Sequence, residues 1–262
     1  MKIQTQNIFF SHDSKNNIPA INNFNIQFEP GNFYSILGPN GSGKTTFLDL
    51  LTGYLKPDSG EILFDNTNIN SFSKNQMAKK IALVSQDYYI NFPFIVREVV
   101  TMGRRPYMGR FFSPDKEDIK IVNNIAEITQ IQELMGRKVT CLSGGETQRV
   151  VFARALCQTT PILLLDEAFS NMDISHSINL LKNLKNQIKQ KGIIVISVFH
   201  DINFASIWSD YMIFLKSGSI IASGEPEAVL TKDIIKQVYN IDAQIEFNKF
   251  CSANQVYFLT KQ

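Results

Sequence analysis

The chain has 262 residues, of which 44% are hydrophobic and 19% are charged, and its formal net charge is +2. This length and composition fit a large folded domain and exclude a disordered chain. The net charge is too small to predict binding to nucleic acid or to an anionic membrane surface.

Neither a membrane span nor a disulfide framework is evident. The longest apolar run, residues 193–199, is far shorter than the roughly 18 residues that a spanning helix needs. The first residues, MKIQTQNIFF, lack the apolar region of a signal peptide. The cysteines, Cys141, Cys157 and Cys251, fit no metal or disulfide spacing. We therefore expect a soluble chain in a reducing compartment, with any membrane role supplied by a partner.

The first 85 residues are rich in strand signals. Residues 1–30 alternate apolar and polar side chains between turn-rich breaks, which predicts an antiparallel β region. Residues 33–37 predict a buried strand that leads into a glycine-rich loop. A helix is expected from Lys44 to Thr52, with Gly53 as its stop. Further strands are predicted at residues 61–65 and 81–85.

The pattern changes between residues 87 and 160, where helical stretches such as 115–129 predominate and predict a helical insertion. Strands return at residues 162–167 and 193–199, and residues 211–224 predict a hairpin that turns at KSGS. Two short helices are expected near EPEAVL and KDIIKQVYN. The residues after them carry no usable motif.

The stretch GPNGSGKT at residues 38–45 fits the phosphate-loop pattern G-x-x-x-x-G-K-[ST]. Its glycines let the backbone wrap a polyphosphate, and the helix N-terminus that follows favours an anion. Lys44 is expected to reach the β- and γ-phosphates of ATP, and the Thr45 hydroxyl to hold Mg²⁺. A glycine-rich turn without a ligand is the alternative, but the strand–loop–helix order favours the phosphate loop. The predicted nucleotide-binding residues here are Gly38, Pro39, Asn40, Gly41, Ser42, Gly43, Lys44, Thr45 and Thr46.

Residues 162–167 (ILLLDE) form an apolar stretch that ends in two carboxylates. We expect Asp166 to lie near Mg²⁺ and Glu167 beside the γ-phosphate, where it could orient or deprotonate the attacking water. A buried strand with a solvated acidic end is the alternative. The preceding phosphate loop favours the catalytic interpretation.

A second glycine-rich stretch, LSGGE at residues 142–146, opens a predicted helix and offers backbone N–H groups to an anion. Together with the phosphate loop it indicates a nucleotide that is held from two sides.

These motifs, in this order, resemble the ABC ATPase family, the nucleotide-binding subunits of ABC transporters, over nearly the whole chain. The resemblance implies an α/β fold with a phosphate-loop NTPase core, a mixed sheet with flanking helices, an antiparallel β part and a helical subdomain. It implies one ABC ATPase domain over residues 1–262, with the helical subdomain inserted at about 87–160. Two copies would pair head to tail, and the signature residues would contact ATP held by the other copy; these are Ser143, Gly144, Gly145 and Glu146.

Three shorter matches follow from the same resemblance. Gln86 corresponds to the Q-loop glutamine, which senses Mg²⁺ and the attacking water. His200 corresponds to the switch histidine, which contacts the γ-phosphate. In SNMD, residues 170–173, Asp173 keeps the acidic position of the D-loop, although Asn171 and Met172 differ from the usual residues. Without the family match, a single Gln after a strand would carry no functional meaning, and a single His would more often be structural.

Two residues are candidates for stacking on adenine. His12 aligns where the family usually has Tyr, and Phe10 is a nearby alternative. A His ring stacks with less area than a Tyr ring.

Residues 91–118 resemble the stretch after the Q-loop in the ATPases of iron–siderophore, haem and vitamin B12 importers. The alternative is that the aromatic residues here pack the helical subdomain. The matching positions are Val96, Arg97, Glu98, Gly103, Arg104, Pro106, Gly109, Arg110 and Phe111.

The resemblance therefore implies Mg²⁺-ATP hydrolysis that energises import through a separate integral membrane permease. We expect the chain at the cytoplasmic face of the cell membrane, with a substrate-binding protein as an indirect partner and no nucleic acid. Two ATP molecules would close the dimer, and hydrolysis at Glu167 would reopen it.

Two alternatives remain. One is an ABC ATPase for another cargo, such as zinc or manganese, or for export; residues 91–112 argue against it. The other is a non-transport ABC ATPase in DNA maintenance or translation. The single phosphate loop, the single signature and the lack of sustained heptads argue against that one.

Overall fold

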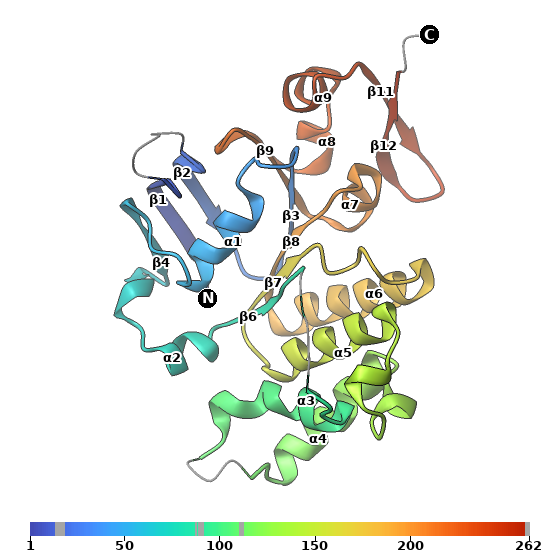
Figure 1. The fold of residues 1–262 in the computed structure, drawn as a ribbon. Coiled ribbons are helices and arrows are strands. Elements are labelled where there is room, and N and C mark those ends of the chain that lie inside the picture. The colour runs from blue at the N-terminus through green and yellow to red at the C-terminus, as the bar shows by residue number, and fades with distance from the viewer. Residues whose placement is uncertain (14–18, 87, 89–91, 110–112, 260–262) are drawn as a thin grey trace. The chain divides into compact units, whose positions relative to one another are not determined.

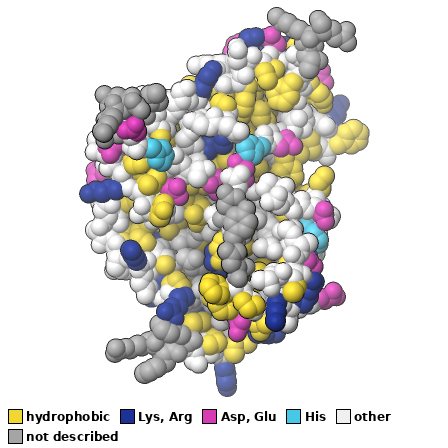
Figure 2. All heavy atoms as spheres, in the orientation of Figure 1, with side chains coloured by type: hydrophobic (Ala, Val, Ile, Leu, Met, Phe, Trp, Pro, Cys, Tyr) yellow, Lys and Arg dark blue, Asp and Glu magenta, His cyan; other side chains and the backbone are white. Residues whose placement is uncertain are grey.

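The computed structural model describes the chain except for residues 14–18, 87, 89–91, 110–112 and 260–262 (Figure 1). Two compact units are present: Met1–Ser71 together with Ile194–Gln262, and Phe72–Ile193. In the described part of the chain, no helix is long and apolar enough to cross a membrane. Figure 2 shows lysine and arginine side chains spread over the visible face among acidic ones, as the small net charge leads one to expect.

The first unit begins with a small antiparallel sheet in the order β2-β1-β4-β5. Its strands are β1 (Ile3–Phe10), β2 (Ile21–Phe28), β4 (Ser59–Phe64) and β5 (Thr67–Asn68). Phe24 and Phe28 of β2 pack against Phe47 of helix α1 (Lys44–Thr52), with ring centroids 4.5 and 6.2 Å apart. The predicted antiparallel β region and the predicted helix are confirmed, and Gly53 ends the helix in the left-handed conformation.

A parallel layer carries the rest of this unit. Strand β3 (Phe33–Leu37) is buried along its length and pairs in parallel with β8 (Ile194–Val198) and β9 (Tyr211–Lys216). Strand β10 (Ser219–Gly224) forms the predicted hairpin with β9. Runs of β-branched and aromatic residues without alternation are typical of such buried parallel strands.

The C-terminal part of this unit contains helices α7 (Ile202–Trp208), α8 (Pro226–Val229) and α9 (Lys232–Tyr239). It ends in an antiparallel hairpin of β11 (Ala243–Asn248) and β12 (Ala253–Phe258), in which Ile245 lies opposite Val256. The sequence predicted no element here, because the strands are short and polar and lack a strong turn signal.

The second unit contains the parallel strands β6 (Ile81–Val84) and β7 (Ile162–Asp166), with Val84 opposite Leu165. Its other elements are mainly helical. They are α2 (Lys74–Ala78), α3 (Val96–Thr101), α4 (Lys116–Ile128), α5 (Gly144–Cys157) and α6 (Ile174–Lys191), with short 3₁₀ turns at Met102–Tyr107, Gln132–Leu134 and Val139–Cys141. Parallel and antiparallel strand pairs with flanking helices confirm the predicted α/β class, which has a separate antiparallel sheet.

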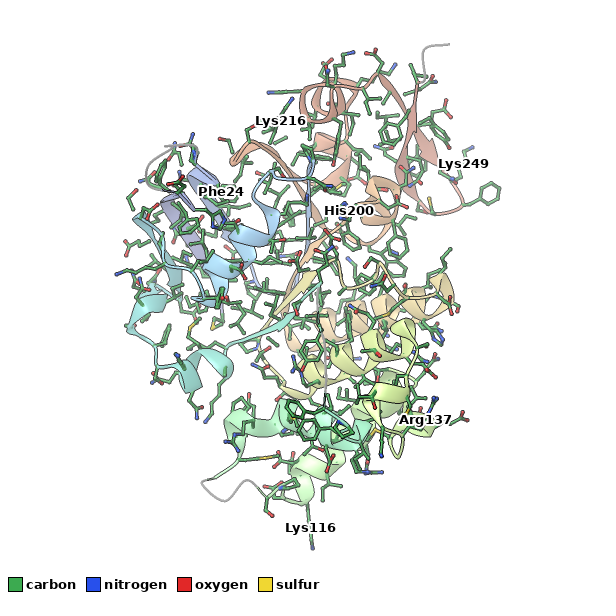
Figure 3. All side chains as sticks on the ribbon, viewed as in Figure 1. Phe24, Lys116, Arg137, His200, Lys216 and Lys249 are labelled. Atoms are coloured by element: carbon green, nitrogen blue, oxygen red, sulfur yellow. The ribbon has the colours of Figure 1, made fainter. Side chains whose placement is uncertain are left out.

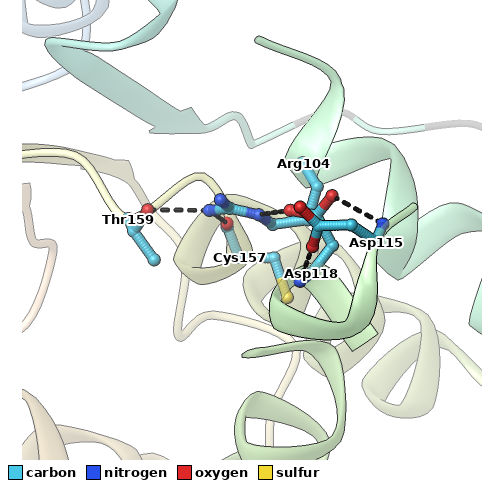
Figure 4. Close-up of polar contacts among 5 residues, drawn as sticks. All are labelled: Arg104, Asp115, Asp118, Cys157 and Thr159. Carbon is cyan, nitrogen blue, oxygen red and sulfur yellow. Dashed lines mark hydrogen bonds and ion pairs between the residues drawn. The ribbon is translucent and has the colours of Figure 1, made fainter. Parts of the chain in front are cut away.

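A buried ion pair organises the helical part of the second unit (Figure 4). The Arg104 side chain donates from Nε to Asp118 Oδ1 at 2.8 Å and from Nη1 to the carbonyl of Cys157 and the hydroxyl of Thr159, both at 2.8 Å. Beside it, a Cβ on Gly103 would lie 2.1 Å from the carbonyl oxygen of Arg154, so only glycine fits there. The segment that resembles importer ATPases is thus fixed to α4 and to the end of α5.

Candidate functional site

The glycine-rich loop between β3 and α1 is tightly enclosed by neighbouring backbone. Gly38 has φ of 152° and Gly43 has φ of 100°. A Cβ on Gly38 would lie 2.2 Å from the Leu215 carbonyl oxygen, and one on Gly43 would lie 2.3 Å from that of Ala20. Both glycines are therefore required by conformation and by space.

The start of α1 suits an anion. Its N-cap is Gly43, which offers no side chain to cap the first turn, and the N-terminus of a helix favours an anion. Lys44 is buried, and its Nζ donates to the carbonyls of Gly38 at 2.9 Å and Pro39 at 3.0 Å. A buried ammonium group beside a helix N-terminus fits the polyphosphate of a nucleotide. The exposed Thr45 hydroxyl follows at the next position.

The two candidates for adenine stacking differ in exposure. Phe10 is 8% exposed and thus buried, whereas His12 is exposed. The His12 ring meets Phe10 edge-on with centroids 5.0 Å apart, and its Nε2 lies 3.1 Å from the Thr46 hydroxyl. Burial raises the pKa of the nearby Asp49 carboxyl, and the charge of His12 opposes the rise. His12 is thus the ring that a ligand beside Thr46 could reach.

His200 follows β8 and lies exposed in the first unit (Figure 3). Ile36 of β3 is in register with Val198 of β8, and the Phe199 N–H donates to the Ile36 carbonyl at 3.1 Å. Gly38 and His200 are therefore each two residues beyond a paired position at the same edge of the sheet. Ligands of open α/β sheets bind at this carboxyl edge.

The second unit repeats this relation with Gln86 and Glu167. Val84 and Leu165 are in register, and each polar residue lies two positions further on. Gln86 Nε2 donates to Glu167 Oε2 at 2.6 Å. Glu167 has φ of 51°, and its carbonyl accepts hydrogen bonds from the Ser170 N–H at 3.1 Å and hydroxyl at 2.9 Å. A non-glycine residue in the left-handed region is a strained feature that is frequent at functional sites.

The donor set for a metal is sparse. In the described ranges, no group of three or more His, Cys, Asp or Glu side chains could hold an ion by itself. Mg²⁺ keeps several waters and takes one or two carboxylates plus substrate phosphates, so a sparse set suits it. Thr45 belongs to the first unit, whereas Asp166, which is buried, and Gln86, which is exposed, belong to the second.

The signature residues form the start of α5. Ser143 is the N-cap: its hydroxyl accepts from the Glu146 N–H at 3.3 Å, and Glu146 Oε2 accepts from the Ser143 N–H at 2.8 Å. Glu146 Oε1 also lies 3.1 Å from Arg137 Nη1. The hydrogen bond from the Ser143 backbone N–H is the largest cause that lowers the pKa of the Glu146 carboxyl. Within the chain Glu146 therefore shapes the signature, while Ser143 and Gly144 are exposed.

A polar cavity of about 480 Å³ lies between the signature and the D-loop, with Ser143 and Asp173 among its lining residues. His176 and Arg149 also line it, and the sequence did not single them out. His176 Nδ1 lies 2.9 Å from Gln130 Oε1, and Arg149 Nη1 donates to the Gln130 carbonyl. The available signal was a His three positions after the D-loop Asp, on the first turn of α6.

The candidate residues thus gather in two groups, one in each unit. The phosphate loop, His12 and His200 belong to the first, and Gln86, Asp166, Glu167, the signature and Asp173 to the second. Arg110 and Phe111, two positions of the importer-like segment, lie outside the described residues.

The fold and the loop between β3 and α1 define the chain as a phosphate-loop nucleoside triphosphatase of the α/β class. A family model described as "ABC transporter" matches residues 21–170. The chain belongs to the ABC transporter family, and as an ATPase of that family it binds and hydrolyses ATP.

Curated relatives resemble the chain over most of its length. The petrobactin import ATP-binding protein YclP of Bacillus subtilis is 33% identical, and the match covers 84% of this chain and 87% of the relative. The hemin import ATP-binding protein HmuV of Escherichia coli O157:H7 is 36% identical, with coverage of 93% and 94%. The iron(3+)-hydroxamate import ATP-binding protein FhuC of Bacillus subtilis is 36% identical, with coverage of 86% and 84%.

Solved structures agree with this fold. An inward-facing metal-chelate type ABC transporter is similar with a TM-score of 0.81 at 24% identity, over 98% of this chain and 96% of that chain. The dimeric ABC transporter cassette MJ0796 is similar with a TM-score of 0.77 at 29% identity, over 85% and 98%.

Proposed function

We propose that the chain is the ATP-hydrolysing subunit of an importer for an iron–siderophore complex, haem or cobalamin. The observation that carries this proposal is the set of relatives named as import ATP-binding proteins for petrobactin, hemin and iron(3+)-hydroxamate at 33–36% identity. A cobalamin import ATP-binding protein from Halobacterium salinarum is 35% identical over 80% of this chain and 52% of that protein. The cargo itself would be bound by other proteins.

In this proposal the loop N–H groups and Lys44 bind the β- and γ-phosphates, and His12 covers the adenine. His200 contacts the γ-phosphate from the edge of the same sheet. Glu167 orients or deprotonates the attacking water, and Gln86 holds the Glu167 carboxylate at the 2.6 Å contact. The left-handed backbone of Glu167 supports this role, because the turn fixes the direction in which the side chain leaves the backbone.

The residues that would hold Mg²⁺ are Thr45, Asp166 and Gln86. When bound, Mg²⁺ neutralises charge on the phosphate oxygens. Its binding would need the two units to present these residues together.

A second copy of the chain is the proposed first partner. The exposed Ser143 and Gly144 and the half-buried Gly145 would present the start of α5 to ATP bound by the other copy, with Asp173 beside them. The dimeric cassette among the similar structures supports this arrangement.

An integral membrane permease is the proposed second partner, reached from the cytoplasmic face of the membrane, and a substrate-binding protein would act through it. Apolar side chains near the Q-loop support docking: Phe92 is 69% exposed, Met102 44%, and Phe94 and Tyr107 39% each. Exposed apolar side chains grouped in one segment are typical of protein interfaces.

A non-transport ABC ATPase and an importer of zinc or manganese are less favoured. The reported relatives are import proteins for iron complexes, hemin and cobalamin.

Affinity purification of the tagged Glu167→Gln variant from detergent-solubilised membranes tests the proposal. Wild-type protein and Lys44→Ala are purified in parallel, and proteins that co-purify are identified. We expect a permease of the siderophore, haem or cobalamin type. Recovery with ribosomes or DNA-associated proteins, and no permease, would contradict the transport role while leaving the ATPase chemistry in place.

A further inference from the structure

The C-terminal hairpin is attached to α7 by specific hydrogen bonds. It lies outside residues 21–170, which the family model matches. Strand β12 packs beside α7 (Figure 1). The Asn203 side chain donates from Nδ2 to the Val256 carbonyl at 3.1 Å, and its Oδ1 accepts from the Val256 N–H at 2.6 Å. One amide thus satisfies both backbone groups of a buried residue.

A second contact lies one turn further along α7. Gln255 Nε2 donates to the hydroxyl of the buried Ser206 at 3.0 Å. Two neighbouring residues of β12 therefore bind two positions of α7. This pattern fixes the rotation of the helix as well as its distance from the hairpin.

Asn203 also belongs to the start of α7. Asp201 caps the helix, and its Oδ1 accepts from the backbone N–H of Asn203 at 2.8 Å and of Phe204 at 3.0 Å. His200 immediately precedes this cap. Asn203 therefore makes two connections. Its backbone N–H binds the cap that follows His200, and its side chain binds the hairpin.

Helix α9 reaches the other end of the site. Tyr239, its last residue, lies near the backbone of Gly38, where the phosphate loop begins. Burial raises the pKa of the Tyr239 phenol to about 12, and the Gly38 backbone opposes part of this rise. The phenol is thus neutral at any ordinary pH, and its hydroxyl keeps both donor and acceptor capacity.

We propose that residues 232–258 form a brace that positions the phosphate loop and His200 relative to each other, and that Asn203 is the positioning residue through which the hairpin acts on His200. The proposal rests on the proposed role of His200 in ATP hydrolysis. Gly38 and His200 follow the ends of neighbouring parallel strands, and the brace lies beside the chain at each of them.

The two contacts should affect different steps. Loss of the Asn203 contact would leave the phosphate loop intact but would let the start of α7 move, so His200 would lose alignment with the γ-phosphate. Small displacements of a positioned group reduce the rate of a reaction strongly. Loss of the Tyr239 hydroxyl would instead loosen the loop that binds the phosphates, and so weaken ATP binding.

The experiment uses the full-length chain with Asn203→Leu, which keeps the side-chain volume and removes both hydrogen bonds. We expect kcat for ATP hydrolysis to fall about tenfold with KM for ATP unchanged. Tyr239→Phe should raise KM more than it lowers kcat. The matched control is Gln244→Leu in β11, since the Gln244 amide contacts Glu246 within the hairpin; its activity should match wild type. Denaturant unfolding of each variant reports whether the chain is folded.

The outcomes distinguish failure of the brace proposal from failure of the proposed function. His200→Ala is measured alongside. If His200→Ala abolishes hydrolysis while folded Asn203→Leu keeps wild-type kcat, the brace is refuted and the proposed function stands. If His200→Ala hydrolyses ATP normally, the assigned role of His200 is itself wrong. If Asn203→Leu loses kcat only in proportion to the unfolded fraction, the hairpin contributes stability alone and the brace is refuted. Asn203→Asp keeps the acceptor for the Val256 N–H, so its kcat should lie between that of Asn203→Leu and that of wild type.

Discussion

At the scale of single residues, the contact between Gln86 and Glu167 has a clear physical origin. Parallel pairing of β6 and β7 brings the positions two residues beyond the Val84–Leu165 pair to the same edge. The Gln86 amide then donates to the Glu167 carboxylate at 2.6 Å. A hydrogen bond from this neutral amide fixes the orientation of the Glu167 carboxylate.

Glu167→Gln tests this assignment. The amide keeps the size of the side chain but cannot accept a proton from water, so we expect hydrolysis to fall by about 100-fold or more with nucleotide affinity retained. The measurements are steady-state ATPase rate and titration with a fluorescent nucleotide. The control is Glu227→Gln, an exposed carboxyl on α8. A variant with a wild-type rate would remove Glu167 from the chemistry.

Several candidate residues were predictable because their signal is local. The strand, glycine-rich loop and helix at residues 33–52 appear in the structure within the predicted bounds. The Gln86–Glu167 contact was not predictable, because it depends on register between strands about 80 residues apart in the chain. His176 was missed because its contact with Gln130 depends on a turn after α4.

At the scale of elements, two devices hold the second unit. Ser143 and Glu146 cap α5 reciprocally, and Arg104 joins the 3₁₀ turn at Met102–Tyr107 to α4 and α5. Each acts where a helix end would otherwise leave polar groups without partners. The hairpin β11–β12 shows the limit of sequence patterns at this scale, because its strands gain order by packing on α7.

The cap of α5 makes stability depend on pH. The pKa of Glu146 is lowered in the folded chain, chiefly by the Ser143 backbone contact. The contribution is therefore fully present above the unfolded pKa of about 4.3 and is lost as pH falls through the lower folded pKa. We expect Glu146→Gln to be less stable than wild type at pH 7 and to approach wild type near pH 3. Urea unfolding at both pH values measures this. An equal difference at both would show that the charge has no part in the cap.

The Arg104–Asp118 pair should matter far more than an exposed pair. Side chains of both residues are less than a tenth exposed, so Arg104→Met leaves a buried carboxylate without its cation. Loss of one partner of a buried pair costs about 3–5 kcal/mol of unfolding free energy. The control is Lys236→Met, which breaks the half-exposed pair with Asp242 and should cost less than about 1 kcal/mol. Equal losses in chemical denaturation would show that Arg104 is not held as described.

At the scale of the whole molecule, the proposed function gives each copy both halves of a nucleotide site. The phosphate loop belongs to one unit and the signature to the other. A head-to-tail dimer would bring the α5 N-terminus of one copy to ATP bound by another. Binding of ATP at the loop and closure of the dimer are then separable events, and substitutions can act on one without the other.

Gly144→Glu separates these two events. A Cβ on Gly144 meets nothing within 4 Å, and the residue is exposed, so the variant should fold. Its carboxylate would stand at the α5 N-terminus, where the γ-phosphate of the other copy is expected, and would repel it. Both proteins are compared by light scattering in the Glu167→Gln background with Mg²⁺-ATP. The protein with Gly144 should form a dimer of two 29.7 kDa chains. The Gly144→Glu variant should stay a monomer with unchanged affinity for ATP.

The matched control for this test is Gly136→Glu, because a Cβ on Gly136 also meets nothing within 4 Å. The same charge is then added to the same unit, beside Arg137 rather than at the α5 N-terminus, so dimerisation should be retained. If both variants dimerise, ATP is not sandwiched at Ser143 and Gly144. If both fail to dimerise, the added charge acts through general repulsion between the copies. Only a loss of dimerisation that is confined to Gly144→Glu supports a nucleotide site that the second copy completes.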